Sequence, residues 1–232
     1  MQAKREPIAL EGVACLNTCY HKKGEDVLKL LFHSLYLHMR KLKIIEHISL
    51  DGVIQLSKDD NDFPYADWTT PYRGPAGRDE VIAAQGSRFD LMLGRRTYDI
   101  WSDYWPKAPS SPIADAFKVA TKFVATHRPE SLAWGPFEAI GPDLVEDVRR
   151  IKSQAGPDLV LWGSSTLTSI LLEHALADEV VLVTYPVLLG TGKRLFADGI
   201  PPRSLTLVST KAVPTGVLFN TYNVVGPLKT GS

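Results

Sequence analysis

Strand-like and helix-like segments alternate along the chain from Arg40 onward, and this alternation limits the possible folds more than any other feature. Short runs of apolar residues that end in glycine or proline are typical of buried strands, whereas apolar spacings of three and four are typical of helices. The predicted strands are 43–49, 90–93, 122–126, 159–162 and 180–184. The predicted helices are 79–88, 96–101, 142–153 and 166–174. Because strands joined through helices pair in parallel, we expect an α/β fold with a mostly parallel central sheet and helices on both faces.

Two β-rich runs follow the alternating part of the chain. They span residues 204–211 and 217–225 and flank the turn residues 214–216. Such a pair predicts an antiparallel hairpin at the end of the fold. Earlier in the chain, residues 59–77 are rich in Asp, Pro and Gly, which predicts a long irregular loop.

The character of the sequence changes near Met39. Residues 1–38 mix polar and apolar side chains without a clear period. We therefore expect an N-terminal extension that is poorly ordered, apart from a short helix over residues 25–37, with Met39 as the functional start. Residues 39–228 are predicted to form the folded domain.

Charge and apolar content argue against several classes of protein. The 26 basic and 26 acidic residues give a formal net charge of zero, which argues against a large surface for nucleic acid or anionic membrane. No apolar run reaches the roughly 20 residues that a membrane-spanning helix needs. We therefore expect a cytoplasmic protein that binds neither nucleic acid nor membrane.

The residues that most often bind metals give no strong pattern. Cys15, Cys19 and His21 lie close together in the sequence, but a fourth zinc ligand is not evident near them. No metal site is predicted. His47 lies inside the first predicted strand, where a hydrogen-bonded core histidine is more typical than a catalytic base.

Two glycine turns connect a predicted strand to a predicted helix. Gly94 precedes Arg95 and Arg96, whose guanidinium groups suit a phosphate. Gly163 precedes the hydroxyl residues 164–166, which suit a diphosphate at a helix N-terminus. Neither segment is a Walker loop or a G-x-G-x-x-G dinucleotide fingerprint. Each glycine also fits a simple turn, and the two arginines also fit a solvated helix start, so both interpretations stay open.

The residues around these turns resemble one superfamily of reductases. Residues 94–98 (Gly-Arg-Arg-Thr-Tyr) look like the G-R-x-T-x segment of dihydrofolate reductases. Residues 49–52 (Ser-Leu-Asp-Gly) are similar to the S-x-D-G segment of the reductase domain of bifunctional riboflavin-biosynthesis deaminase–reductases. Residues 162–196 resemble the C-terminal half of that domain, most specifically in residues 186–196 (Pro-Val-Leu-Leu-Gly-Thr-Gly-Lys-Arg-Leu-Phe). The sequence lacks the zinc signature of the deaminase half, so it resembles a stand-alone reductase domain over residues 40–225.

The resemblance implies a dihydrofolate-reductase-like fold that binds NADPH. The residues expected near the cofactor's phosphates on the first turn are Gly94, Arg95, Arg96 and Thr97. Those expected to hold the diphosphate on the second turn are Gly163, Ser164, Ser165 and Leu167. Thr126 and His127 are expected near the adenosine end, and Asp51 and Gly52 beside the nicotinamide. Asp51 is the catalytic candidate, for handling a proton or anchoring the substrate, and a simple Asp-Gly turn is the alternative.

The chain departs from dihydrofolate reductases in two places. Gly163-Ser164 stands where they carry Gly-Gly, and their acidic helix residue has only a poorly aligned counterpart at Asp79 or Glu80. Three functions stay open. The first is NADPH-dependent reduction of a small heterocyclic (pteridine- or pyrimidine-like) or other C=N or C=O substrate. The second is a dedicated dihydrofolate reductase or 5-amino-6-(5-phosphoribosylamino)uracil reductase, and the third is non-catalytic nucleotide binding on the same fold. The resemblance also implies a homodimer in contact through the C-terminal strands.

Overall fold

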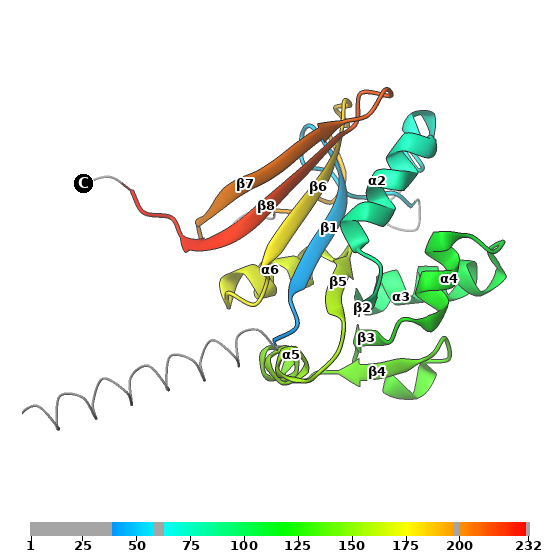
Figure 1. The fold of residues 1–232 in the computed structure, drawn as a ribbon, viewed down its shortest axis with the longest axis vertical. Coiled ribbons are helices and arrows are strands. Elements are labelled where there is room, and N and C mark those ends of the chain that lie inside the picture. The colour runs from blue at the N-terminus through cyan, green and yellow to red at the C-terminus, as the bar shows by residue number, and fades with distance from the viewer. Residues whose placement is uncertain (1–38, 58–62, 197–199, 231–232) are drawn as a thin grey trace, which may run out of the picture. The chain divides into compact units, whose positions relative to one another are not determined.

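The computed structural model describes residues 39–57, 63–196 and 200–230, and Figure 1 shows how they are arranged. The expected extension, with its predicted helix and with Cys15, Cys19 and His21, lies outside the described residues. The chain from Arg40 onward forms one compact unit.

A single sheet of eight strands runs through the described part of the chain, in the order β4-β3-β2-β5-β1-β6-β8-β7. The strands are β1 (Leu42–Ser49), β2 (Phe89–Gly94), β3 (Lys122–Ala125), β4 (Phe137–Ile140), β5 (Asp158–Trp162), β6 (Glu179–Tyr185), β7 (Arg203–Ala212) and β8 (Leu218–Pro227). Neighbours pair in parallel from β4 across to β6, and β8 and β7 continue the sheet in antiparallel register. The mostly parallel sheet and its terminal hairpin are therefore confirmed.

Helices cover both faces of this sheet, as the alternation predicts (Figure 1). Helices α2 (Pro75–Gln85), α3 (Arg95–Tyr104) and α4 (Pro112–Val119) contribute to one buried apolar cluster, and α5 (Leu144–Ser153) and α6 (Ser165–Glu173) contribute to a second. In β1, Ile45 belongs to the first cluster and Ile44 to the second, because side chains alternate between the faces of a strand. Short 3₁₀ helices occur at η1 (Thr70–Tyr72), η2 (Trp105–Lys107) and η3 (Pro129–Ser131).

Local signals explain where the elements differ from the sequence prediction. Helix α2 begins at Pro75 rather than at 79, because proline at the first helical position loses no hydrogen bond. It ends before Gly86, whose φ of +85° stops the helix before the predicted end at 88. Helix α4 and strand β4 are absent from the prediction. Ser111 begins α4 by accepting the Ala114 N–H, and β4 is a four-residue strand between two Gly-Pro pairs.

The C-terminal hairpin extends the sheet beyond β6. Its turn is closed by the Val213 N–H, which donates to the Val217 carbonyl at 3.0 Å. Strand β7 lies at the edge of the sheet, and most of its side chains are exposed. None of the described helices is long and apolar enough to span a membrane.

Candidate functional site

The strand order creates a switch point between β2 and β5. From β2 the chain passes through α3 and α4 to β3 on one side, whereas from β5 it passes through α6 to β6 on the other side. Helices α3 and α6 therefore begin on opposite faces of the sheet, since they belong to different buried clusters. In open α/β sheets, ligands bind beyond the carboxyl ends of the strands at such a point. The turns after β2 and β5 are thus the first candidates for a ligand site.

The two glycine turns lie against each other. A Cβ atom on Gly94 would be 2.7 Å from Ser164 Oγ, and a Cβ atom on Gly163 would be 2.9 Å from Thr97 Oγ1. At such distances a Cβ atom on either glycine forces the opposing hydroxyl side chain, or the turn that carries it, to shift. Gly163 and Ser164 are also both left-handed, with φ of +67° and +62°. The structure therefore brings together four of the sequence-predicted site residues in one close contact.

Helices α3 and α6 both begin at this contact. At the start of α6, the Ser164 hydroxyl accepts the Leu167 N–H at 3.3 Å, while the N–H groups of Ser165 and Thr166 have no acceptor within the helix. At the start of α3, the N-cap residue Gly94 has no side chain to accept a first-turn N–H. Ser165 as a whole is only 5% exposed, whereas the next residue, Thr166, is exposed. Backbone donors and the positive ends of two helix dipoles suit an anion such as a diphosphate.

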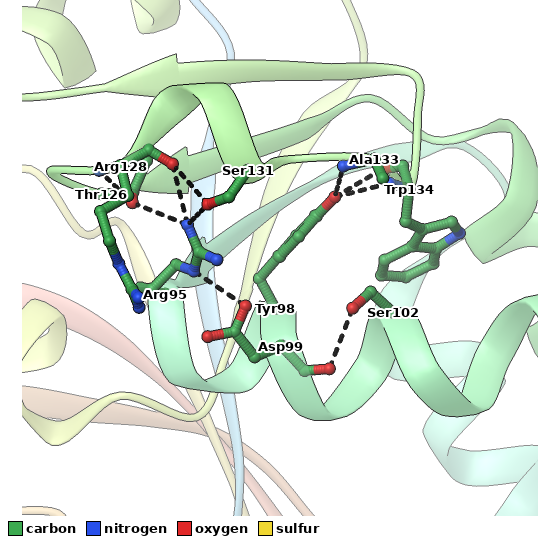
Figure 2. A network of polar contacts seen from close by, with 9 residues as sticks. All are labelled: Arg95, Tyr98, Asp99, Ser102, Thr126, Arg128, Ser131, Ala133 and Trp134. Atoms are coloured by element: carbon green, nitrogen blue, oxygen red, sulfur yellow. Dashed lines mark hydrogen bonds and ion pairs between the residues drawn. The ribbon is translucent and has the colours of Figure 1, made fainter.

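The Arg95 guanidinium is held by the segment that follows β3, as Figure 2 shows. Its Nε donates to Asp99 Oδ1 at 2.8 Å. Its Nη1 donates to Ser131 Oγ at 2.7 Å, to the Arg128 carbonyl at 2.9 Å and to Thr126 Oγ1 at 3.3 Å. Arg95 and Thr126, both expected at the cofactor, are therefore neighbours, and in this structure Arg95 joins α3 to residues 126–131.

Tyr98 and Arg96 complete the surroundings of α3. The Tyr98 hydroxyl accepts the N–H groups of Trp134 at 2.6 Å and Ala133 at 2.9 Å, which fixes the helix along the same segment (Figure 2). Arg96 is exposed, and its Nη2 lies 3.5 Å from Ser57 Oγ in the loop after β1. Of the two arginines, Arg96 is thus the one with a solvent-exposed side chain at the start of α3.

Asp51 connects the loop after β1 to the loop after β6. Its carboxylate accepts the Ser49 hydroxyl at 2.6 Å and the N–H groups of Gly190 at 2.8 Å and Leu189 at 3.1 Å. The Ser49 hydrogen bond, helped by those of the two N–H groups, lowers the pKa of Asp51 to about 2. Gly52, with φ of +86°, completes the turn. An ionised carboxylate with these partners suits the anchoring of a loop or a substrate better than the donation of a proton.

The sequence interpretation missed Glu46, which lies inside β1. Its side chain is only 4% exposed, and burial raises its pKa to about 8. Its Oε1 accepts the His47 N–H at 3.0 Å, and its Oε2 is buried without a hydrogen-bond partner among the described residues. The signal was present, because an acidic residue inside an apolar strand must be neutral or paired to be buried.

His47 lies on the opposite face of β1 from Glu46. Its Nδ1 lies 2.9 Å from the Tyr185 hydroxyl, and its ring stacks on Trp162 with ring centres 5.4 Å apart. Burial, with a smaller effect of the Arg73 charge, lowers the pKa of His47 to about 4. The imidazole is therefore neutral at physiological pH and is part of an aromatic wall at the carboxyl ends of β5, β1 and β6.

The remaining candidates lie elsewhere. Glu80 on α2 pairs with Lys211 of β7 at 2.9 Å, and Asp79 is exposed beside it. His127 is exposed after β3. Within residues 39–57, 63–196 and 200–230, no three His, Cys, Asp or Glu side chains are arranged to hold a metal ion.

Known proteins share this sequence pattern and this architecture. The sequence profile of the RibD C-terminal domain family matches residues 40–219. The uncharacterized protein YyaP of Bacillus subtilis (strain 168) is 29% identical over 139 residues, which are 57% of this chain and 72% of YyaP.

Solved structures extend the comparison. A putative riboflavin biosynthesis protein from Shewanella sp. PV-4 superposes with a TM-score of 0.61 at 20% identity, over 80% of this chain and 99% of that one. Dihydrofolate reductase from Enterococcus faecalis, solved with NADP(H) and RAB-propyl, superposes with a TM-score of 0.54 at 15% identity, over 79% of this chain and 96% of that one. At these identities the structures establish the shared fold, and the expected dihydrofolate-reductase-like architecture is confirmed.

Proposed function

The chain belongs to the RibD C-terminal domain family, and on that premise we propose that it is an NADPH-dependent reductase. Its substrate is a small heterocycle of the pteridine or pyrimidine type, or another compound with a reducible C=N or C=O bond. The family is one of reductases, and the fold is shared with an enzyme whose structure contains NADP(H). Both observations support a nicotinamide cofactor.

The observation that carries this proposal is the contact between the two glycine turns. Helices α3 and α6 each begin close to a glycine, which has no side chain to block the helix N-terminus. Both N-termini adjoin the switch point where α/β sheets bind nucleotides. A diphosphate suits this helix start, because the first-turn N–H groups of α6 lack acceptors within the helix, while the absence of side chains at Gly94 and Gly163 lets the two turns lie against each other.

The residues around this contact have distinct proposed roles. The N–H groups of Ser165 and Thr166 hold the diphosphate, Arg96 meets a phosphate at the surface, and Gly52 lies beside the nicotinamide. NADPH, when bound, supplies the hydride. The protein orients the reacting groups and excludes water. The buried rings of Trp162 and Tyr185 form part of the apolar surface that excludes water from the site.

The test is a titration of the purified protein with NADPH and with NADH, followed by tryptophan quenching and nicotinamide emission. We expect tighter binding of NADPH, because a guanidinium group and the 2′-phosphate form charge-assisted hydrogen bonds. Arg96→Ala should weaken NADPH about 10- to 100-fold with little effect on NADH or on the melting temperature.

Arg95→Ala serves as the matched comparison on the same helix. It removes the contacts to residues 126–131, so we expect a loss of stability of about 1–3 kcal/mol together with any change in binding. Binding of NADPH with no turnover of any heterocyclic, imine or carbonyl substrate would favour a non-catalytic nucleotide-binding protein. Failure of the wild-type protein to bind either nucleotide would rule out the proposed cofactor.

A further inference from the structure

His47 contacts two aromatic residues near the carboxyl edge of the sheet. Its imidazole stacks on the Trp162 ring, with an angle of 28° between the planes and ring centres 5.4 Å apart, and its Nδ1 lies 2.9 Å from the Tyr185 hydroxyl. Trp162 directly precedes Gly163 of the proposed diphosphate turn, and the Gly52 turn, proposed beside the nicotinamide, follows β1. His47 therefore lies near the strand ends from which both proposed cofactor turns begin.

The hydrogen bond between His47 and Tyr185 determines which imidazole nitrogen carries the proton. Tyr185 is only 5% exposed, and Nδ1 of His47 is the only hydrogen-bond partner of its hydroxyl among the described residues. Burial raises the pKa of Tyr185 to about 12 and lowers that of His47 to about 4, so at neutral pH the phenol keeps its proton and the imidazole carries only one. A buried hydroxyl needs an acceptor. Nδ1 therefore accepts the phenol proton, and the imidazole proton is on Nε2.

Two further rings hold the Tyr185 side chain in place. Trp68 and Tyr72 meet its ring at near right angles, with ring centres 5.2 Å and 5.8 Å away. The Trp68 indole N–H donates to the Gln55 carbonyl at 2.7 Å, which ties this contact to the loop after β1. Packed edge-to-face contacts of this kind restrict the phenol ring, so its hydroxyl stays directed at Nδ1.

The second imidazole nitrogen, Nε2, is left for a ligand. It makes no hydrogen bond to any described residue, and it is not one of the fully buried polar atoms that lack a partner. His47 is partly exposed, whereas its neighbours Glu46 and Ile48 are only 4% and 6% exposed. The Nε2–H group is therefore an oriented donor that solvent or a bound ligand can reach.

We propose that His47 is a catalytic residue of the reductase, and that its Nε2–H binds the heteroatom of the substrate's C=O or C=N bond and protonates it. This inference rests on the proposed function, in which the hydride comes from NADPH. The hydride forms the new C–H bond, and the π electron pair moves to the heteroatom. The heteroatom takes the Nε2 proton while Nδ1 takes the Tyr185 hydroxyl proton. After the product leaves, water on the open side returns a proton by the same path.

The donor acts most strongly in the transition state. The substrate heteroatom becomes more negative and more basic as hydride adds to the neighbouring carbon. A hydrogen bond from Nε2–H strengthens as this charge develops, which lowers the barrier rather than only tightening the binding of the substrate. The role therefore requires a substrate whose reducible bond ends in an oxygen or nitrogen with a free lone pair.

The first test needs neither nucleotide nor substrate. Nuclear magnetic resonance of the full-length protein with nitrogen-15-labelled histidine reports which imidazole nitrogen carries the proton, and His47→Phe assigns the His47 signals. We expect the Nε2–H form in the wild type at pH 7 and a mixture of both forms in Tyr185→Phe. A proton on Nδ1 in the wild type, or a Tyr185→Phe spectrum equal to that of the wild type, would overturn the proposal.

The second test follows NADPH oxidation with dihydrofolate and with 5-amino-6-(5-phosphoribosylamino)uracil. His47→Phe keeps a ring on Trp162 but has no donor, so we expect kcat to fall about 100- to 10,000-fold with little change in KM or in NADPH affinity. His47→Gln, whose amide N–H can replace Nε2–H, should recover part of this loss. Tyr185→Phe, which acts through His47, should lower kcat about 10- to 100-fold.

His174→Gln is the matched control, since His174 is exposed at the end of α6, and it should keep the wild-type kcat. A His47→Phe variant as active as the wild type, or a His47→Gln variant no better than His47→Phe, would overturn the catalytic role while leaving the proposed function intact. A wild type that turns over neither substrate nor any other C=O or C=N compound would refute the proposed function, and this role with it.

Discussion

Two carboxyl groups close together in the sequence have opposite environments in this protein. Burial in β1 raises the pKa of Glu46 to about 8, whereas the Ser49 hydroxyl and the N–H groups of Leu189 and Gly190 lower that of Asp51 to about 2. Residue type alone does not separate them. Their surroundings do: burial inside the sheet acts on Glu46, whereas hydrogen-bond donors from the loop after β6 act on Asp51.

Replacing Asp51 with Asn tests whether its charge holds the loop after β6. Asn keeps one acceptor oxygen and loses the charge, so we expect the free energy of unfolding at pH 7 to fall by about 1–2 kcal/mol. A lowered pKa stabilises the fold above the ordinary value of 3.8, and this contribution is lost as the pH falls through about 2. The difference between wild type and variant should therefore shrink below pH 4.

Urea unfolding at pH 7 and at pH 3 measures this difference. The exposed Asp103 gives a control, since Asp103→Asn should change stability by less than about 0.5 kcal/mol. An equal difference for Asp51→Asn at both pH values would mean that the charge contributes nothing.

The sequence identifies the residues at the strand ends more readily than their partners. Gly94 and Gly163 follow apolar strands and precede helices, which is enough to predict two turns at one edge of a parallel sheet. The contacts of Arg95 could not be predicted, because Ser131 belongs to a segment whose course depends on tertiary packing. The sequence suggested two equivalent arginines, and their separate directions became visible only in the structure.

At the scale of elements, the helix after β2 and the helix after β5 begin so close together that each limits the other. A Cβ atom at Gly94 meets Ser164 Oγ, and one at Gly163 meets Thr97 Oγ1. The packing is reciprocal, so a change in one turn is transmitted to the other.

A double substitution tests this contact. Gly94 has φ of −69°, which any residue adopts, so Gly94→Ala acts only through the overlap with Ser164. We expect Gly94→Ala to cost about 1–3 kcal/mol of stability. Ser164→Gly alone should cost only a few tenths of a kcal/mol, since glycine tolerates the N-cap position and the positive φ.

The combined variant Gly94→Ala/Ser164→Gly should recover most of the loss, as measured by thermal and urea unfolding. Additive effects of the two changes would show that the turns are not packed against each other as described.

The strands and helices with a strong apolar period were predictable, and the elements with weak local signals were not. Strand β1 has buried apolar residues on both faces, so the sequence alone was enough to identify it as a buried strand. Strand β4 has four residues at the edge beyond β3, and Phe137 at its start is exposed, so its pairing depends on β3 rather than on its own pattern. Helix α4 is begun by Ser111 and Pro112, a signal that an analysis of apolar spacing alone overlooks.

At the scale of the whole molecule, the sheet ends in an exposed strand with apolar side chains. Leu205, Leu207 and Val208 of β7 are 38%, 54% and 54% exposed, and Val225 of β8 is 63% exposed. Long edge strands with apolar residues invite pairing with another chain. We propose that a second copy covers this hairpin in a homodimer.

Substitution of Leu207 and Val225 by Lys tests the dimer. Sedimentation or light scattering should give twice the 25.6 kDa chain mass for the wild type and the single mass for Leu207→Lys/Val225→Lys. Val119, which is 76% exposed on α4, gives a control, since Val119→Lys should leave the mass of the wild type unchanged. A monomeric wild type, or a dimer that persists in the double variant, would contradict this assembly.

Strand β1 is the first strand of the described residues, yet it lies in the middle of the sheet. Its partners are residues 159–162 of β5 and residues 179–185 of β6, whereas β2 and β3 pair with each other at short range along the chain. Chain entropy makes such distant pairings slow, and folding rates fall as contacts become less local. During synthesis β1 therefore emerges long before either of its partners, and we expect its pairing with β5 and β6 to be a late event in folding.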